Sequence, residues 1–231
     1  MFDNKLEQKR KINFFINKIY HLIFSEKFSK KIKFNFDKKS RLDLINYVIE
    51  KNKYNKYLEI GCHNNEVFDQ IRIKKIGVDP ISGGNFRGTS DYFFSENSKK
   101  FDCIFIDGLH EYNQVSEDIK NSLNVLNDNG IILLHDCLPT TLHKQAVPRY
   151  KNIWNGDVWK CIVYYRTLKN IDIVTCKIDQ GISAVRKIKN KDFLDLNVKN
   201  FKELKFRDFY YNYPKYMRIL EYKDFLEYIK N

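Results

Sequence analysis

The sequence predicts an α/β domain built on a mostly parallel sheet that helices cover on both faces. Four short apolar segments, at residues 57–61, 75–79, 101–107 and 130–135, each end in a glycine, an acid or a histidine. Such nearly continuous apolar runs are typical of strands buried on both faces. Strands of this kind that alternate with helices imply a parallel sheet.

The remaining elements follow from apolar spacing and from stop signals. A helix is expected between the third and fourth strands, because one helix face is formed by Val115, Ile119, Leu123 and Leu126. Residues 128–130, Asp-Asn-Gly, should end it. Asp157 can cap a helix that reaches about Leu168, and two more strands are expected at 171–176 and 182–185.

Two helical extensions flank the domain. We expect an N-terminal extension at 1–53, the α/β domain at 54–190 and an aromatic, helical tail at 191–231 that packs on the domain. In the basic N-terminal part, residues with helical spacing are Phe14, Phe15, Ile19, Leu22 and Ile23. This pattern predicts an amphipathic helix that packs on the domain with a solvated basic face, with loose attachment to an acidic membrane surface as the alternative.

Composition limits the class of protein. The hydrophobic share of 43% allows a sizeable core, and no apolar run approaches the roughly 20 residues that span a bilayer. No secretory signal is evident, and the five cysteines form no C-x-x-C pair, so a cytoplasmic protein with reduced, buried thiols is expected. The net charge of +12 is spread along the whole chain, and no specific nucleic acid is expected as a partner.

The first two strands end in residues suited to a ribose-bearing ligand. Glu59-Ile60-Gly61-Cys62 closes the first strand, and Asp79 closes the second, 20 residues after Glu59. An acid at this distance can accept hydrogen bonds from ribose hydroxyls. The dinucleotide pattern G-x-G-x-x-G is missing, which argues against a nicotinamide enzyme. A single glycine suits a ligand without phosphates, bound through its ribose and its amino-acid end.

These segments resemble a known family. "YLEIGCHNNEVF" and "IGVDP" are similar to the first two motifs of class I S-adenosylmethionine-dependent methyltransferases, although Asn65 stands where the last glycine of the first motif is usual. Asn tolerates a left-handed backbone better than most residues. "GTSDYFF", "FDCIFIDGLHEYNQVSEDI", "NGIILLHDCLP" and "NGDVWK" resemble the sugar and small-molecule O-methyltransferases of polysaccharide gene clusters. The resemblance covers residues 54–190 and implies a Rossmann-like, mostly parallel seven-stranded sheet.

The resemblance also implies roles for single residues in binding S-adenosylmethionine. Glu59 would orient the methionine end, Asp79 would hold the ribose, and the whole cofactor-binding set would be Glu59, Gly61, Cys62, Asp79, Thr89, Ser90, Asp91 and Asp107. Other interpretations stay open. Glu59 could bond a helix N-terminus, and Asp91 could be a helix N-cap.

The third and fourth strands supply the chemistry. If these strands are neighbours, as in the resembled fold, their backbones lie about 4.8 Å apart. Asp107, His110, His135 and Asp136 would then converge. The resemblance implies a divalent metal, Mg²⁺ or Mn²⁺, on Asp107, His135 and Asp136. The alternative is metal-free catalysis with His135 as general base, His110 as second candidate and Asp107 as its orienting carboxylate. His110 could equally be a purely structural residue.

The predicted function is O-methylation of a sugar or related small molecule in cell-surface polysaccharide biosynthesis. Residues 137–156 form a long segment after the fourth strand, and we interpret it as a substrate lid whose basic residues suit an anionic or nucleotide-linked sugar. A nucleic-acid methyltransferase and a non-catalytic binding module are the alternatives. Residues 107–110 lack the N/D-P-P-aromatic signature of enzymes that methylate base amines. The oligomeric state is open, with a dimer plausible.

Overall fold

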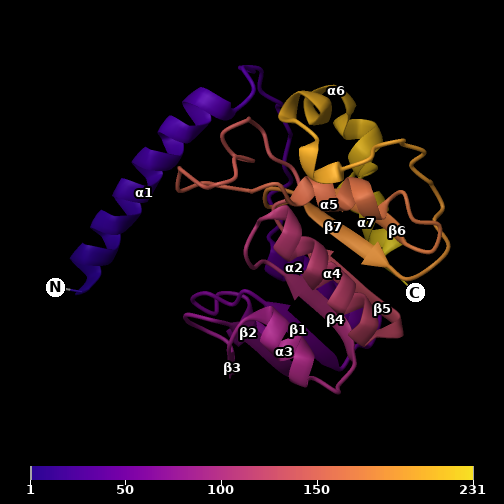
Figure 1. Ribbon diagram of the computed structural model, residues 1–231. Helices are drawn as coiled ribbons and strands as arrows, with labels where there is room; N and C mark the ends of the chain where they lie inside the picture. Colours follow the sequence, from indigo (N-terminus) through magenta and orange to yellow (C-terminus); the bar gives the residue numbers. More distant parts are fainter. Residues whose placement is uncertain (1, 231) are drawn as a thin grey trace.

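A computed structural model describes residues 2–230, with the side chains of residues 2–6 left out. It contains one eight-stranded sheet in the order β3-β2-β1-β4-β5-β7-β6-β8 (Figure 1). The strands are β1 (Lys56–Ile60), β2 (Lys74–Asp79), β3 (Phe86–Arg87), β4 (Phe101–Ile106), β5 (Leu126–Leu134), β6 (Asp172–Cys176), β7 (Ile182–Arg186) and β8 (Ile219–Leu220). Only β7 runs antiparallel to its neighbours. The predicted Rossmann-like, mostly parallel sheet is confirmed, with eight strands instead of seven.

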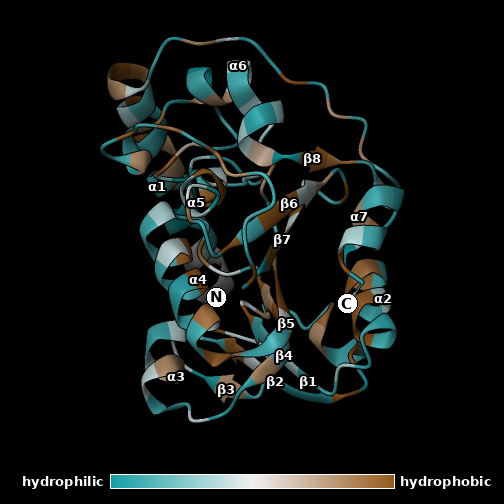
Figure 2. Cartoon of the chain, turned by 90° about the vertical axis from the view of Figure 1, so that its right-hand side faces the viewer, coloured by the Kyte–Doolittle hydropathy of each residue, from teal (hydrophilic) through white to brown (hydrophobic). Residues whose placement is uncertain are grey.

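Helices cover both faces of the sheet. The described helices are α1 (Phe2–Phe24), α2 (Arg41–Lys51), α3 (Ser90–Glu96), α4 (Tyr112–Val125), α5 (Val158–Tyr165), α6 (Phe206–Met217) and α7 (Tyr222–Tyr228), with short 3-10 turns η1 (Phe68–Gln70) and η2 (Phe201–Glu203). All of these helices except α1 pack against the sheet or against its covering helices. Figure 2 shows α3 and α4 on one side of the strands and α2 and α7 on the other.

Each face has its own core because side chains alternate along a strand. Leu58 and Ile104 point toward α3, α4, α5 and α6, and they belong to the larger apolar cluster. Tyr57 and Phe105, one residue away on the same strands, belong to a second cluster with α2 and α7. The central strands β1 and β4 are therefore buried over most of their length. The polar residues that follow the strands lie at the carboxyl ends of the strands, where ligands bind in such folds.

Two local expectations were wrong. The Asp-Asn-Gly sequence at 128–130 lies inside β5, because α4 already ends at Val125. Asp157 occupies the N-cap position of α5 but makes no cap bond there. Its carboxylate instead accepts a hydrogen bond from the backbone N–H of Tyr112, at the start of α4 (2.6 Å). The Asp157 carboxylate therefore connects the start of α5, just after the predicted lid, to the start of α4.

The N-terminal helix forms as expected, but it does not pack on the domain through its apolar residues. Phe15, Ile19, Leu22 and Ile23 are all exposed. Figure 1 shows α1 projecting from the body of the molecule. None of the described helices is both long and apolar enough to cross a membrane. The boundaries 1–53, 54–190 and 191–231 stay a prediction.

Candidate active site

The ends of β4 and β5 bring Asp107 and His135 together. The two strands pair in parallel, with Ile106 opposite Leu134, and the backbone N–H of His135 donates to the carbonyl of Ile106 (3.1 Å). The neighbouring strands expected from the sequence are confirmed. The next residues on each strand therefore emerge side by side at the carboxyl edge of the sheet.

Asp107 lies between two imidazoles. Its Oδ1 is 3.0 Å from Nδ1 of His135 and 3.3 Å from Nε2 of His110. In a neutral His135 this contact would place the proton on Nδ1 and leave Nε2 as the acceptor. Burial would lower the pKa of His135, but Asp107 and the neighbouring carboxylates outweigh it and raise the pKa well above its usual value. Burial alone would raise the pKa of Asp107, but the two histidines outweigh it and hold the pKa far below its usual range.

Two residues that the sequence did not single out cover the other side of His135. Nε2 of His135 is 3.3 Å from an Arg41 guanidinium nitrogen and 3.4 Å from Oδ1 of Asp179. Arg41 also contacts Asp179 (3.3 Å) and exposed Glu66 (3.6 Å). The Arg41 contact suits a neutral imidazole, and the Asp179 contact suits a protonated one. The surroundings of His135 therefore accommodate both states of a base.

His110 and Asp136 form the other half of the cluster. Nδ1 of His110 is 3.0 Å from Oδ2 of Asp136, but outside hydrogen-bond geometry, so this buried nitrogen has no hydrogen-bond partner. Burial opposes the charged imidazole, yet Asp107 and Asp136 outweigh it and raise the pKa of His110 to about 10. The His110 side chain is 16% exposed against 3% for His135. His110 therefore lies nearer to solvent.

The end of the predicted lid holds this half in place. The Trp154 ring stacks on His110 (5.4 Å between centroids), and Asn155 donates to Oδ1 of Asp136 (2.9 Å). Gly156 has φ +62°, and a Cβ there would lie 1.7 Å from the carbonyl oxygen of His110. Only glycine permits this close approach. The "NGDVWK" motif thus positions the loop after β4.

Three side chains of the cluster could hold a metal ion. Ligand atoms of Asp107, His110 and Asp136 all lie within 4.8 Å of one another. The sequence placed His135 in this set, whereas the structure brings His110 into it and bonds His135 to Asp107. Two carboxylates and an imidazole nitrogen without a hydrogen bond form a donor set that fits a divalent cation.

The predicted cofactor residues lie at the ends of β1 and β2. Gly61 has φ +89°, and a Cβ would lie 2.4 Å from the carbonyl oxygen of Asp107, so the β1 and β4 ends touch here. Buried Glu59 accepts a hydrogen bond from the Tyr57 hydroxyl (2.7 Å). Burial raises the pKa of Glu59 to about 7, although this bond opposes the shift. The thiol of Cys62 is buried and directed toward the Glu59 carbonyl (3.8 Å).

Asp79 organises the loops around this region. Its carboxylate accepts backbone hydrogen bonds from His63 (2.9 Å), Ile81 (2.8 Å) and Ser82 (2.8 Å). Asn65 has φ +65°, as expected from its place in the first motif, and its side chain accepts from the N–H of Gly84 (2.7 Å). The carboxylate of Asp79 and the side-chain oxygen of Asn65 therefore join the loops after β1 and β2.

The start of α3 is capped by Thr89, which accepts from the N–H of Tyr92 (3.2 Å). The interpretation of Asp91 as the N-cap is therefore wrong. Asp91 and Ser90 instead both accept from the amide of Gln114 on α4 (3.2 Å each). These polar groups lie together near the end of β4, on the side toward β2.

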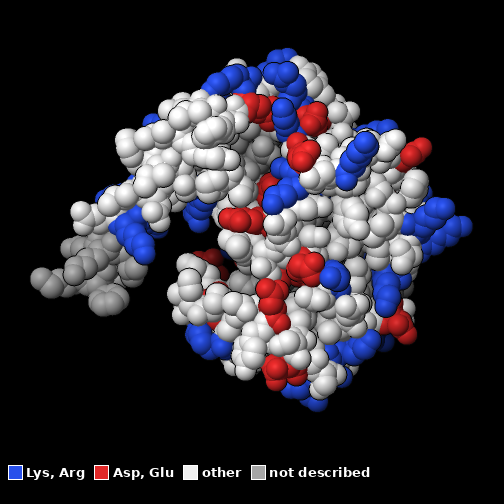
Figure 3. Space-filling model, viewed as in Figure 1, with Lys and Arg blue, Asp and Glu red and all other residues white. Residues whose placement is uncertain are grey.

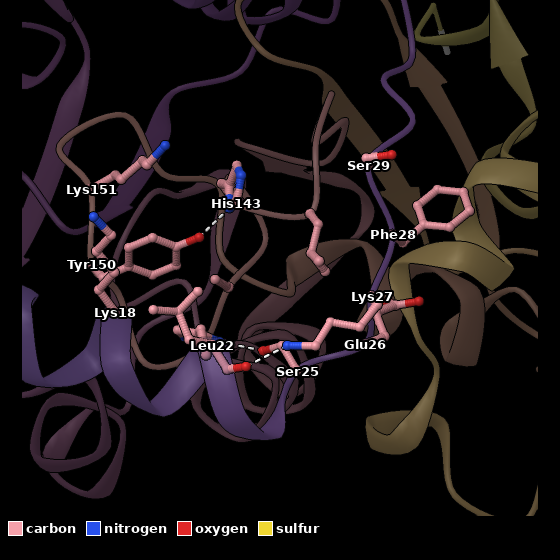
Figure 4. A pocket seen from close by; sticks show the side chains of 13 residues that line it. Lys18, Leu22, Ser25, Glu26, Lys27, Phe28, Ser29, His143, Tyr150 and Lys151 are labelled. Carbon is pink, nitrogen blue, oxygen red and sulfur yellow. Dashed lines mark hydrogen bonds between the residues drawn. The ribbon is translucent and has the colours of Figure 1, made fainter.

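A cavity of about 770 Å³ lies between the C-terminal end of α1, the chain that follows it, and the lid (Figure 4). Lys18, Lys27 and Lys151 line it. The one acid in its lining, Glu26, accepts hydrogen bonds from the backbone at the start of α6. The cavity does not contain the Asp107 cluster. Trp154 connects the two, because it stacks on His110 and donates to the carbonyl of Ala146, which lines the cavity (2.6 Å).

Comparison with known proteins agrees with this architecture. Residues 49–137 match a family model described as a methyltransferase domain. A solved structure from Klebsiella pneumoniae, described as an O-methyltransferase, superposes with a TM-score of 0.50 at 10% identity, over 82% of this chain and 96% of that chain. A cofactor-bound protein from MTB gives 0.50 at 8% identity, over 68% and 85%. No curated protein sequence matches significantly.

The sheet order and the helices on both faces give a Rossmann-like α/β fold, which the structure from Klebsiella pneumoniae shares. Together with the match over residues 49–137, this fold supports an S-adenosylmethionine-dependent methyltransferase.

Proposed function

We propose that this protein transfers the methyl group of S-adenosylmethionine to a hydroxyl of a sugar or related small molecule, in cell-surface polysaccharide biosynthesis. The observation that carries the proposal is the bond of Asp107 to both His110 and His135 at the ends of β4 and β5. A new bond forms between the acceptor oxygen and the methyl carbon while the bond from that carbon to sulfur breaks. The electron pair stays on sulfur, and the hydroxyl proton passes to an imidazole, with His135 as the proposed base.

The charges of the cluster support assistance by a cation. Three carboxylates, those of Asp107, Asp136 and Asp179, contact His135, and Arg41 is the permanent cation beside them. Two negative charges remain for two protonated imidazoles, or one divalent ion, to balance. Protonated imidazoles cannot act as bases. A divalent ion would balance the carboxylates and leave His135 free to accept a proton.

Asp107, His110 and Asp136 would hold such an ion, as Mg²⁺ or Mn²⁺. It would supply Lewis-acid polarisation of a bound acceptor oxygen. The protein's own contribution is to orient the imidazoles through Asp107 and to fix Asp136 through Asn155.

Removal of divalent ions should therefore lower activity. We expect EDTA to reduce turnover and Mn²⁺ to restore it. Mn²⁺ binding to the cofactor-free protein, followed by electron paramagnetic resonance, should weaken at least about tenfold in Asp136→Asn, because a charged ligand is lost. The matched control is Asp69→Asn, an exposed acid on η1. Unchanged turnover after rigorous chelation would exclude the metal and leave the metal-free base.

The acceptor is proposed to be anionic, such as a nucleotide-linked sugar. Lys18 and Lys151 line the cavity and have no carboxylate partner among the described residues. The pKa of His143 there is lowered by burial and by nearby cations that include Lys151. The five buried, free cysteines support a reducing, cytoplasmic setting. Figure 3 shows Lys and Arg scattered over the visible face, with no single patch that favours nucleic acid.

Cofactor binding should depend on the ionisation of Glu59. If its carboxylate accepts hydrogen bonds from the cofactor's amino group, only the ionised form binds well. The pKa of Glu59 is about 7 without cofactor, so affinity for S-adenosylhomocysteine should fall about tenfold per pH unit below 7 and level off above it. Calorimetry across pH 5 to 9 checks this. Glu59→Gln should remove the dependence, and a variant that keeps it would exclude this role.

A further inference from the structure

One face of α1 contacts the rest of the protein. The side chain of Asn17 donates to the carbonyl of Arg149 (2.7 Å), and His21 contacts the carbonyl of Pro148 through Nε2 (2.8 Å) and the ring of Tyr150. Phe14 lies under the Arg149 guanidinium (5.9 Å). Residues 14, 17 and 21 share one helix face. The contact face is therefore largely polar, and it meets the lid.

The opposite face is apolar and uncovered. Ile12, Ile16, Ile19 and Ile23 follow one another at intervals of four, three and four residues, and at about 100° per residue they centre roughly 180° from the contact face. Their exposed fractions are 53%, 56%, 42% and 64%. The stripe is widened by exposed Phe15. We call these five residues the outer stripe. No part of the described chain covers it.

The net charge of α1 decides between two occupants of the outer stripe. Over its length α1 carries five basic residues against two acidic ones, and the described acid, Glu7, is already paired with Lys11 (2.9 Å). Lys9, Arg10 and Lys18 are exposed. Two copies of such a helix would repel each other when their stripes met. A negatively charged surface would attract each copy, and the apolar stripe could then enter its interface.

We propose that α1 binds the surface of an anionic lipid bilayer, with the outer stripe in the interfacial region. The described helices include none that could span the bilayer, so the attachment is peripheral. Lys18 and His21 of α1 line the cavity beneath the lid. A bilayer on the outer stripe would then lie about one helix diameter, roughly 10 Å, from that cavity.

Sedimentation of the full chain with vesicles tests the proposal. Vesicles of equal parts phosphatidylcholine and phosphatidylglycerol should bind the protein, and phosphatidylcholine alone should bind it much less. Added salt should weaken the binding, because it screens the charges. The double variant Ile16→Ser, Ile23→Ser should bind at least about tenfold more weakly, since two large side chains leave the interface.

The matched control is Phe193→Ser, which removes an exposed apolar side chain elsewhere and should bind like the unaltered protein. Binding of S-adenosylhomocysteine by the double variant should be unchanged, which shows that the domain is folded and keeps this test separate from the proposed activity. Equal vesicle binding by the double variant would overturn the proposal. So would failure of the unaltered protein to bind, with light scattering showing a dimer that the double variant loses.

Discussion

His135→Ala is expected to lower turnover by roughly 10²–10⁴-fold, the usual contribution of a general base, without weakening S-adenosylhomocysteine binding. The reason lies in the two sides of the ring. Asp107 would accept a hydrogen bond from the Nδ1–H group of His135 (3.0 Å), which leaves Nε2 as the basic nitrogen. Asp179, 3.4 Å from Nε2, would stabilise the imidazolium that forms. Single-turnover kinetics and calorimetry measure the two quantities separately.

His135→Gln is the stricter control. The amide of Gln can still donate to Asp107, but it cannot take a proton, so packing is largely kept while the base is lost. We expect this variant to be as slow as His135→Ala and nearly as stable as the unaltered protein. Full activity in either variant would remove the assignment of His135 as the base.

His110 is the competing candidate for the base. Because it is more exposed than His135, the variants His110→Ala and His135→Ala can be compared to decide between the two. It is stacked on Trp154 at the solvent side of the cluster, whereas His135 is almost fully buried. If His110→Ala abolishes turnover and His135→Ala does not, His110 is the base and His135 orients Asp107 from behind. If His110→Ala chiefly weakens Mn²⁺ binding, His110 acts as a ligand.

The convergence at the active site could be predicted because it follows from strand adjacency. Asp107 and His135 each follow an apolar strand, and parallel neighbours end at the same edge of the sheet. Arg41 and Asp179 could not be found in this way. Arg41 begins α2, far back in the chain, and Asp179 lies in the turn between β6 and β7. Nothing local shows where a turn carboxylate points.

The contacts of the lid residues could not be predicted from the local sequence either. "NGDVWK" was recognised as a motif, but the bond of Asn155 to Asp136 depends on how residues 154–157 pack under the loop after β4. The orientation of α1 was also unpredictable from periodicity. The sequence predicted an amphipathic helix whose apolar side packs on the domain. The helix instead contacts the lid through Asn17 and His21, whose hydrogen bonds go to backbone carbonyls. Such bonds leave no periodic apolar signal.

Asp79→Ala is expected to weaken S-adenosylhomocysteine binding by at least about 100-fold and to lower the free energy of unfolding by about 3 kcal/mol. Three backbone N–H groups lose a charged acceptor, and hydrogen bonds to charged groups contribute about 1.5–3 kcal/mol each. Water can replace part of this at a loop, so the net loss is smaller than the sum. The same substitution frees the loops after β1 and β2, between which the cofactor ribose is proposed to bind.

The contribution of Asp79 to the stability of the protein should depend on pH. Burial would raise the pKa of Asp79, but the three backbone donors and Arg87 outweigh it and lower the pKa. A group whose pKa is lowered on folding stabilises the protein above its unfolded pKa, near 3.9, and loses that contribution as the pH falls further. The stability difference between the unaltered protein and Asp79→Asn should therefore shrink below about pH 4. Chemical denaturation at several pH values measures it.

Asp79→Asn separates loop organisation from ribose binding, with Asp69→Ala as the control for loss of an exposed acid from the neighbouring loop. The amide keeps one acceptor oxygen for the backbone donors but loses the charge that a pair of ribose hydroxyls would favour. We expect its stability to fall by less than in Asp79→Ala, while cofactor affinity falls nearly as far. A variant that loses stability yet binds S-adenosylhomocysteine normally would show that Asp79 only joins the two loops. The ribose would then have to be held by other residues at the carboxyl end of β2.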